Sequence, residues 1–318
     1  MNLNELSFLD RHRDLIQSGS ILAIGALILA GAAYGALASF DATPVPSDSA
    51  VATSTEPAPN AYANMHLTGH AAIVYDLATG DTLYAQDADR PLPLASLTKL
   101  LTLYAAAGVL QDQSPVSITP TALAQDGDYG LTQGETFAFK DLARFALVGS
   151  SNDAAEAIAE AAASSRSMGN VQLLAGAAAA AGLTHTHAEN GTGLDLNTTE
   201  AGAFGSARDV ALLASKLLTK APAIAGSTVE PSVTVRSSTG AVHTLPNTNQ
   251  DVVHVPGILL SKTGFTDIAG GNLVVIYDAG IGHPIAVVVL GSTHEGRFTD
   301  VENLINATGA HFAGVHNK

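Results

Sequence analysis

The stretch "PLPLASLTKLLTLYAAAGVL", Pro91 to Leu110, decides how the rest of the chain is interpreted. From Leu97 onward the residues at i, i+3, i+4 and i+7 are apolar, and small apolar residues fill the other faces, which predicts a buried helix. A lysine, Lys99, interrupts this pattern one helical turn after Ser96. Because burying an ammonium group is unfavourable, a lysine in such a helix has a partner, a chemical task, or both.

Composition limits the classes of function. The chain has 318 residues, 47% of them hydrophobic, which is enough for a substantial core. It contains no cysteine, so disulfides, thiol catalysis and cysteine metal sites are excluded. A formal net charge of −15 would repel phosphate backbones, so we expect no nucleic-acid partner.

The N-terminal region is typical of a membrane anchor followed by a tether. Residues 21–40 lack charged side chains over about the length of a transmembrane helix. The arginines near the N-terminus precede this run and the next basic residue is Arg90, so the positive-inside rule predicts a short cytoplasmic tail at 1–20. The Pro/Ser/Thr-rich residues 41–65 predict a disordered linker, and 66–318 the folded domain.

A cleaved signal peptide is the alternative, with "ALAS" at 36–39 as its cleavage site. We favour the retained single-pass anchor, because the apolar run is long for the core of a signal peptide. Both interpretations place the folded domain outside the cytoplasm, on the periplasmic or cell-wall side of the cytoplasmic membrane.

The folded part begins and ends with strands. Alternating apolar residues around Gly80 predict a β-hairpin, and "STVEPSVTVRS" with "AVHTLP" predicts a second hairpin. Three glycine-bounded apolar runs at 257–264, 271–279 and 283–292 predict further strands, before a final helix at about 297–308.

Helical patterns fill the middle of the chain, at 141–163 with a break at 149–152, at 171–181, and after "SARD" at 206–209. In "SARD" we assign Ser206 as an N-cap and Asp209 to the first turn, a structural role. The order predicts an α/β fold. We expect an antiparallel sheet that contains the first and last strands and is flanked by helices, an all-helical lobe, and a cleft between them.

Ser96 and Lys99 lie on one helix face at i and i+3, so their side chains can come within hydrogen-bonding reach. A buried, neutral Lys99 could take the proton of Ser96 and make it a nucleophile, and the Ser96 N–H at the helix start could stabilise an oxyanion. An S-x-x-K tetrad alone is weak evidence, since about one is expected by chance in a chain of this length. The alternative is a serine cap followed by a lysine that reaches solvent.

Two further motifs follow in order. "SSN", Ser150 to Asn152, is at a predicted helix start, and "KTG", Lys262 to Gly264, is on a predicted strand. These three motifs occur together in serine β-lactamases and penicillin-binding proteins. With segments such as "NGTGLD" and "SKTGFTDIAGGNLVV", residues from about 71 to 304 resemble the D-alanyl-D-alanine carboxypeptidases. These are the low-molecular-mass penicillin-binding proteins of peptidase family S11, which have a serine β-lactamase-like fold.

The resemblance implies a peptidoglycan stem peptide ending in D-Ala-D-Ala as substrate, and β-lactams as covalent inhibitors. Ser96 would attack the penultimate carbonyl, Lys99 would accept its proton, and water would later hydrolyse the acyl-enzyme. Ser150 would relay a proton to the departing D-alanine. No cofactor and no metal are implied.

The remaining motif residues would bind the substrate. The Asn152 amide would hold a substrate amide, and Lys262 and Thr263 would bind the terminal carboxylate. Gly264 would let the substrate backbone approach the strand. The N–H of Phe265 would be the second oxyanion donor beside that of Ser96.

The chain departs from the family pattern in three places. Ser151 stands where many such carboxypeptidases have glycine, and Thr248 stands where some have an arginine that reaches the substrate carboxylate, so we expect weaker carboxylate binding. No C-terminal β-domain or amphipathic anchor helix follows before Lys318, so the N-terminal anchor would take the place of that helix.

Other functions remain open. A D,D-endopeptidase that cleaves peptidoglycan cross-links would use the same site. A β-lactamase would need a deacylating glutamate, for which Glu189 is the candidate, although its surroundings are similar to the carboxypeptidase pattern. An idle penicillin-binding sensor is disfavoured, because Ser96, Lys99 and Lys262 are all intact.

Other polar residues have simpler interpretations. Zinc binding by "HTH" at 185–187 is disfavoured, because no acidic or histidine partner stands at helical spacing. We expect Asp126 and Asp128 to be solvated, and Asp195 and Asp267 to brace loops.

Overall fold

The computed structural model describes residues 60–250 and 254–314. The predicted tail at 1–20, the predicted anchor at 21–40 and most of the predicted linker lie outside these residues. These described residues all belong to one compact unit. No helix in the described part of the chain combines the length and the hydropathy that a bilayer crossing requires.

The folded unit begins earlier than residue 66. Ala61 and Tyr62 are each only 5% exposed, and the Tyr62 hydroxyl donates a hydrogen bond to Thr308 Oγ1 over 2.9 Å. Residues 60–65 therefore pack against the last helix rather than belonging to a disordered linker. The composition of residues 60–65 could not predict this contact, because Thr308 lies near the other end of the chain.

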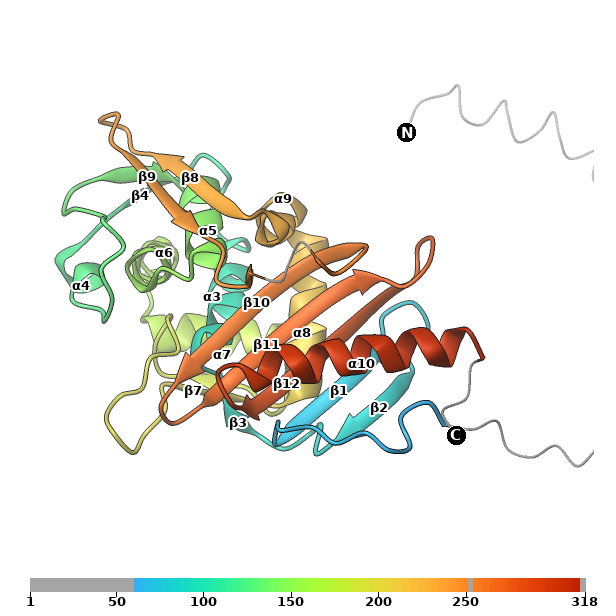
Figure 1. Ribbon diagram of the computed structural model, residues 1–318. Coiled ribbons are helices and arrows are strands. Elements are labelled where there is room, and N and C mark those ends of the chain that lie inside the picture. Colours follow the sequence, from blue (N-terminus) through green and yellow to red (C-terminus); the bar gives the residue numbers. More distant parts are fainter. Residues whose placement is uncertain (1–59, 251–253, 315–318) are drawn as a thin grey trace, which may run out of the picture. The chain divides into compact units, whose positions relative to one another are not determined.

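Five antiparallel strands form the main sheet, in the order β10-β11-β12-β1-β2. The predicted first hairpin is present, and the first and last strands share one sheet as expected (Figure 1). The strands are β1 (Ala71–Asp76), β2 (Thr82–Gln86), β10 (Ile258–Thr266), β11 (Gly270–Asp278) and β12 (Pro284–Ser292).

Both faces of this sheet are buried. In β12, Ala286, Val288 and Leu290 belong to the core on the helical-lobe side, and the alternate residues Ile285, Val287 and Val289 to a second core. Helix α10 (Gly296–Phe312) crosses the second face, as Figure 1 shows. It is longer than the predicted helix at 297–308. Since successive side chains point to opposite faces, a continuous run of apolar residues fills both cores.

The middle of the chain is largely helical, as predicted, and supplies the lobe beside the sheet. Its helices are α3 (Thr98–Ala106), α4 (Pro120–Leu123), α5 (Phe139–Val148), α6 (Asn152–Ser165) and α7 (Asn170–Ala180). Two helices, α8 (Ala207–Lys220) and α9 (Pro222–Ala225), follow, and α8 packs on the sheet face opposite α10.

Short strands complete the fold. They are β3 (Leu92–Pro93), β6 (His187–Ala188) and β7 (Ala203–Gly205) in one sheet, and β4 (Pro115–Ser117) with β5 (Thr136–Ala138) in another. The second predicted hairpin is β8 (Ser232–Arg236) and β9 (Val242–Pro246), but its predicted first residues form the 3-10 turn η2 (Gly226–Val229). Pro231 accounts for the difference, since it donates no ladder hydrogen bond and restricts the residue before it.

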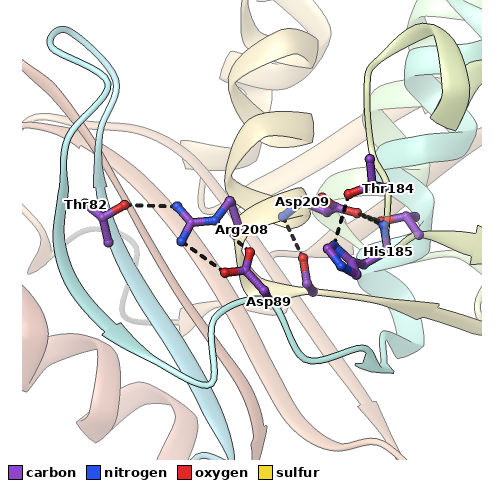
Figure 2. Close-up of polar contacts among 8 residues, drawn as sticks. Thr82, Asp89, Thr184, His185, Arg208 and Asp209 are labelled. Carbon is purple, nitrogen blue, oxygen red and sulfur yellow. Dashed lines mark hydrogen bonds and ion pairs between the residues drawn. The ribbon is translucent and has the colours of Figure 1, made fainter.

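The start of α8 has the predicted structural role. The Ser206 hydroxyl accepts a hydrogen bond from the Asp209 N–H. The Asp209 carboxylate accepts one from the His185 N–H (Figure 2). Arg208 forms an ion pair with Asp89 at 2.7 Å, which ties the helix start to the loop after β2. Asp209 therefore positions a loop and lies outside the cleft described next.

Candidate active site

The reactive serine lies in a strained turn. Ser96 is in η1 (Ala95–Leu97), directly before α3, and Ala95 has φ +48°, a conformation that L-residues rarely adopt. Such backbone strain is kept only where surrounding contacts enforce it, and it is common at active sites. Here it turns the partly exposed Ser96 toward a cleft while Leu97 stays fully buried.

Lys99 is completely buried beside Ser96. Its Nζ lies 2.7 Å from Ser96 Oγ, 2.6 Å from Asn152 Oδ1 and 3.1 Å from the carbonyl oxygen of Thr192. Burial lowers the pKa of Lys99 well below its usual value, and the charge of Lys262 lowers it further. A neutral amine has two N–H donors for the two oxygens of Asn152 and Thr192, and a lone pair that can accept the Ser96 proton. The predicted nucleophile and base are thus in contact.

The second motif faces this pair from α6. Ser151 is the N-cap, its hydroxyl accepting from the Ala154 N–H, which gives the position between Ser150 and Asn152 a structural role. Ser150 has φ +58° and its Oγ accepts from Lys262 Nζ over 2.9 Å. The motif therefore joins the two lysines, since Asn152 contacts one and Ser150 the other.

The third motif lies on β10, the edge strand of the sheet beside the cleft. Lys262 is 1% exposed and also donates to the carbonyl oxygen of Thr263, 3.0 Å away. Burial, with a smaller effect of the Arg297 charge, lowers the pKa of Lys262 to about 7. The Thr263 hydroxyl donates to Thr248 Oγ1 over 2.7 Å.

The structure gives Gly264 a packing role, and its predicted role toward the substrate backbone stays a prediction. A Cβ atom there would lie 2.9 Å from the carbonyl oxygen of Leu94 and 3.3 Å from the Leu97 N. The glycine thus lets the turn that carries Ser96 dock directly on β10. The next residue, Phe265, is 46% exposed and packs edge-on against His294, with ring centroids 4.9 Å apart.

A loop in "NGTGLD" fixes the third contact of Lys99. Asn190 Oδ1 accepts hydrogen bonds from the Thr192 N–H and hydroxyl and from the Gly193 N–H, and its Nδ2 donates to the Leu194 carbonyl. This tight turn holds the Thr192 carbonyl toward Lys99. Asp195, which we expected to brace a loop, accepts from the Thr266 hydroxyl over 3.1 Å and so links the turn to the end of β10.

These groups line one cleft of about 550 Å³. The predicted residues lining it are Ser96, Ser150, Asn152, Thr263, Gly264 and Phe265. The two lysines are buried behind this lining, where Lys99 contacts Ser96 and Lys262 contacts Ser150. Glu189 is exposed and does not line this cleft. In the "HTH" stretch, the ring of His187 stacks on Phe204. Among the described residues no group of three or more His, Cys, Asp or Glu side chains is arranged to hold a metal ion.

Sequence reasoning missed several residues that line the cleft, and two of them form hydrogen bonds with motif residues. Arg297 is 4% exposed, its Nη1 donates to the Gly264 carbonyl over 2.7 Å, and its Nε has no partner among the described residues. The sequence contained a signal for Arg297. A positive charge in the first turn of a helix is unfavourable beside the positive end of the helix dipole, so an arginine at that position indicates another role. The other is Tyr129, whose hydroxyl accepts from Asn152 Nδ2 at 3.3 Å.

The family model for D-alanyl-D-alanine carboxypeptidases of peptidase family S11 matches residues 53–294. The chain belongs to this family. The α/β fold with its helical lobe is also that of penicillin-binding proteins. The chain is similar to penicillin-binding protein D2 from Listeria monocytogenes in its ampicillin-bound form, with 30% identity, a TM-score of 0.66, and coverage of 77% of this chain and 98% of that one.

Two relatives within the family have different named activities. The D-alanyl-D-alanine carboxypeptidase DacF of Bacillus subtilis is 30% identical over 241 residues, which cover 74% of this chain and 60% of that protein. The D-alanyl-D-alanine endopeptidase of Pseudomonas aeruginosa is 30% identical over 239 residues, 71% of this chain and 73% of that protein. The chain thus spans about three fifths of the length of the curated carboxypeptidases that it matches.

Proposed function

We propose that this S11 protein is a serine-type D-alanyl-D-alanine carboxypeptidase that acts on peptidoglycan stem peptides through an acyl-enzyme on Ser96. One observation carries the proposal, the contact of a buried Lys99 amine with Ser96 Oγ at 2.7 Å, in a cleft that Lys262 and Arg297 also border. The amine takes the proton of Ser96, and the alkoxide attacks the carbonyl of the penultimate D-alanine. The backbone N–H groups of Ser96 and Phe265 receive the oxyanion.

The carboxylate end of the substrate lies against the cations of the cleft. Lys262, the Thr263 hydroxyl and the guanidinium of Arg297 form a donor set that matches a carboxylate. Thr248 supplies no charge for the substrate carboxylate, whereas Arg297 on α10 does. Because a guanidinium stays protonated, the cleft keeps one positive charge for that carboxylate. Ser150, in contact with Lys262, passes a proton to the departing amine.

A fluorescent penicillin tests the acyl-enzyme, in line with the ampicillin-bound relative from Listeria monocytogenes. We expect the wild-type protein to be labelled covalently and Ser96→Ala to be unlabelled, because the bond forms on Ser96 Oγ. Ser114→Ala, a serine outside the cleft, is the matched control and retains labelling. An unlabelled wild type, or a labelled Ser96→Ala, overturns the mechanism.

A second experiment separates carboxypeptidase from endopeptidase, the alternative that the Pseudomonas aeruginosa relative supports. The protein is incubated with a pentapeptide stem and with a cross-linked peptide dimer, and the products are identified by mass spectrometry. We expect free D-alanine from the pentapeptide at a rate at least tenfold that of dimer cleavage. Preferential dimer cleavage identifies an endopeptidase, and rapid turnover of penicillin identifies a β-lactamase.

We also propose that the protein is held at the outer side of the cytoplasmic membrane by residues 21–40, with the catalytic domain outside the cytoplasm. The uncharged apolar run and the preceding arginines support this arrangement. Membrane fractionation tests it, with full-length protein in the pellet and resistant to high-salt extraction. Release of a shortened protein into the soluble fraction indicates a cleaved signal peptide instead.

A further inference from the structure

Asn152 uses both of its N–H donors within the protein. Its Oδ1 accepts from Lys99, and its Nδ2 donates to the Asp126 carbonyl over 2.6 Å and to Tyr129 Oη over 3.3 Å. A primary amide has two donor hydrogens, so none is left for a ligand. A substrate carbonyl that binds to Asn152 must therefore displace one of these partners, and the contact with Tyr129 is the longer and weaker one.

Tyr129, the partner that a substrate carbonyl would displace from Asn152, has a donor hydrogen of its own. Its ring lines the cleft together with Ser96 and Asn152, and no acceptor for its hydroxyl proton is present among the described residues. Burial, followed by the charge of Asp153, raises the pKa of Tyr129, so the phenol keeps its proton at neutral pH. The group is thus a hydrogen-bond donor that faces the cleft without a protein acceptor.

The loop that carries Tyr129 is built around its ring. Gly127 has φ +103°, and a Cβ atom there would lie 2.7 Å from the ring of Tyr129. Gly130, on the other side, has φ +76°, and its N–H donates to Asp128 Oδ1. The two glycines permit a backbone that folds back under the aromatic ring and holds it at the cleft wall.

We propose that Tyr129 is a specificity-determining residue that binds the substrate directly. On binding, an amide carbonyl on the acyl side of the scissile bond takes the Asn152 hydrogen that Tyr129 accepts in the free protein. The phenol then donates its own proton to that carbonyl. The inference rests on the proposed function, because it assigns this wall of the cleft to the acyl side of the substrate. The ligand class is therefore an acylated amine, whether a stem peptide or an acylamino β-lactam.

Two penams that differ in this carbonyl test the proposal. Benzylpenicillin has an acylamino side chain, whereas 6-aminopenicillanic acid has only the free amine. We expect Tyr129→Phe to lower the second-order rate constant for acylation by benzylpenicillin about fivefold, the effect of one neutral hydrogen bond, and to leave that for 6-aminopenicillanic acid unchanged. Tyr104→Phe is the matched control, because Tyr104 lies beneath Lys220 and outside the cleft, and we expect it to change neither rate.

A second variant tests the placement of the ring. Gly127→Ala pushes the ring from its position, so we expect it to reproduce the selective loss on benzylpenicillin. Equal loss on both penams in Tyr129→Phe would indicate a structural role, and no loss on either would show that no contact forms. Both results overturn the proposal. If the wild type reacts with neither penam, the proposed function itself fails, which distinguishes the two failures.

Discussion

Lys262 is the side chain whose charge we expect to govern selection of carboxylate-ended substrates. Its pKa of about 7 means that it loses its proton as the pH rises through neutrality, and its attraction for a carboxylate falls with it. We predict that kcat/KM for a peptide with a free terminal carboxylate falls, relative to the same peptide with an amidated end, as the pH rises from 6 to 9. Measuring both peptides across this range gives the ratio directly.

The ratio isolates Lys262, because deprotonation of Lys99 accelerates acylation by both peptides and cancels. We expect about a tenfold fall, which levels off at the value that Arg297 sustains, since a guanidinium stays charged. A ratio that is constant with pH, or that rises, would contradict the assignment of Lys262 to the carboxylate.

Asp153, in the first turn of α6, makes the stability of the protein depend on pH. It is 3% exposed, its Oδ1 has no partner among the described residues, and burial with the nearby Asp128 charge raises its pKa to about 6. Between its ordinary value of 3.8 and about 6, the folded state holds a proton that the unfolded state has released. The free energy of unfolding therefore falls as the pH rises through this window.

We predict that Asp153→Asn raises the Tm by about 5 °C at pH 7, and that the gain disappears below pH 4, where both states are protonated. Thermal unfolding at the two pH values measures this. Asp81→Asn, at an exposed turn residue, controls for the introduction of an amide. A gain of the same size at both pH values would rule out the protonation of Asp153 as its cause.

At the scale of elements, the turn around Asn190 determines whether Ser96 and Lys99 keep their geometry. Gly193 has φ +79°, and a Cβ there would overlap the carbonyl oxygen of Ala95 and approach Thr98 Oγ1. We predict that Gly193→Ala lowers the acylation rate by more than about tenfold, because a small displacement of reacting groups has a large kinetic effect. Labelling kinetics with a fluorescent penicillin check this.

Gly182→Ala is the matched control, since Gly182 has φ +69° but no neighbouring atom within 4 Å of the added Cβ. It should have a similar backbone strain of about 1 kcal/mol and unchanged acylation. If both variants lose activity equally, the backbone strain accounts for the loss and the contact with Ala95 does not.

At the scale of the molecule, the cleft depends on how the helical lobe meets the edge of the sheet. Several hydrogen bonds join that edge to elements outside the sheet. Among them, Lys262 donates to Ser150, Thr263 donates to Thr248, and Thr266 donates to Asp195. The last is the farthest along β10 from Lys262. We predict that Asp195→Ala lowers kcat/KM about threefold, because loss of one hydrogen bond loosens the turn that holds Thr192.

Asp195→Asn is the control, since its amide oxygen still accepts from Thr266, and it should retain most of the activity. Hydrogen exchange of the amides in 190–196 should rise in Asp195→Ala and stay unchanged in Asp195→Asn. Equal exchange in all three proteins would show that the cleft does not need this link.

Several features of the whole molecule were predictable from sequence. Alternating apolar residues identified β1 and β2, and glycine-bounded runs identified β10, β11 and β12, because strand periodicity is a local property. The motif order and helix spacing predicted that Ser96 would meet Lys99, since residues at i and i+3 are neighbours on any helix. The resemblance of the three motifs to the carboxypeptidase family predicted that Ser150 and Lys262 lie in the same cleft.

By itself, then, the sequence determined the main strands and helices, the sheet that joins the two ends of the fold, and the motif residues of the site. Only the tertiary structure decided that Arg297 and Tyr129 line the cleft, that Gly264 makes room for η1, and that residues 60–65 belong to the fold. These contacts join residues far apart in the chain, which no local pattern encodes. A lowered lysine pKa likewise arises from burial and neighbouring charges, and both exist only once the lobe and the sheet have packed together.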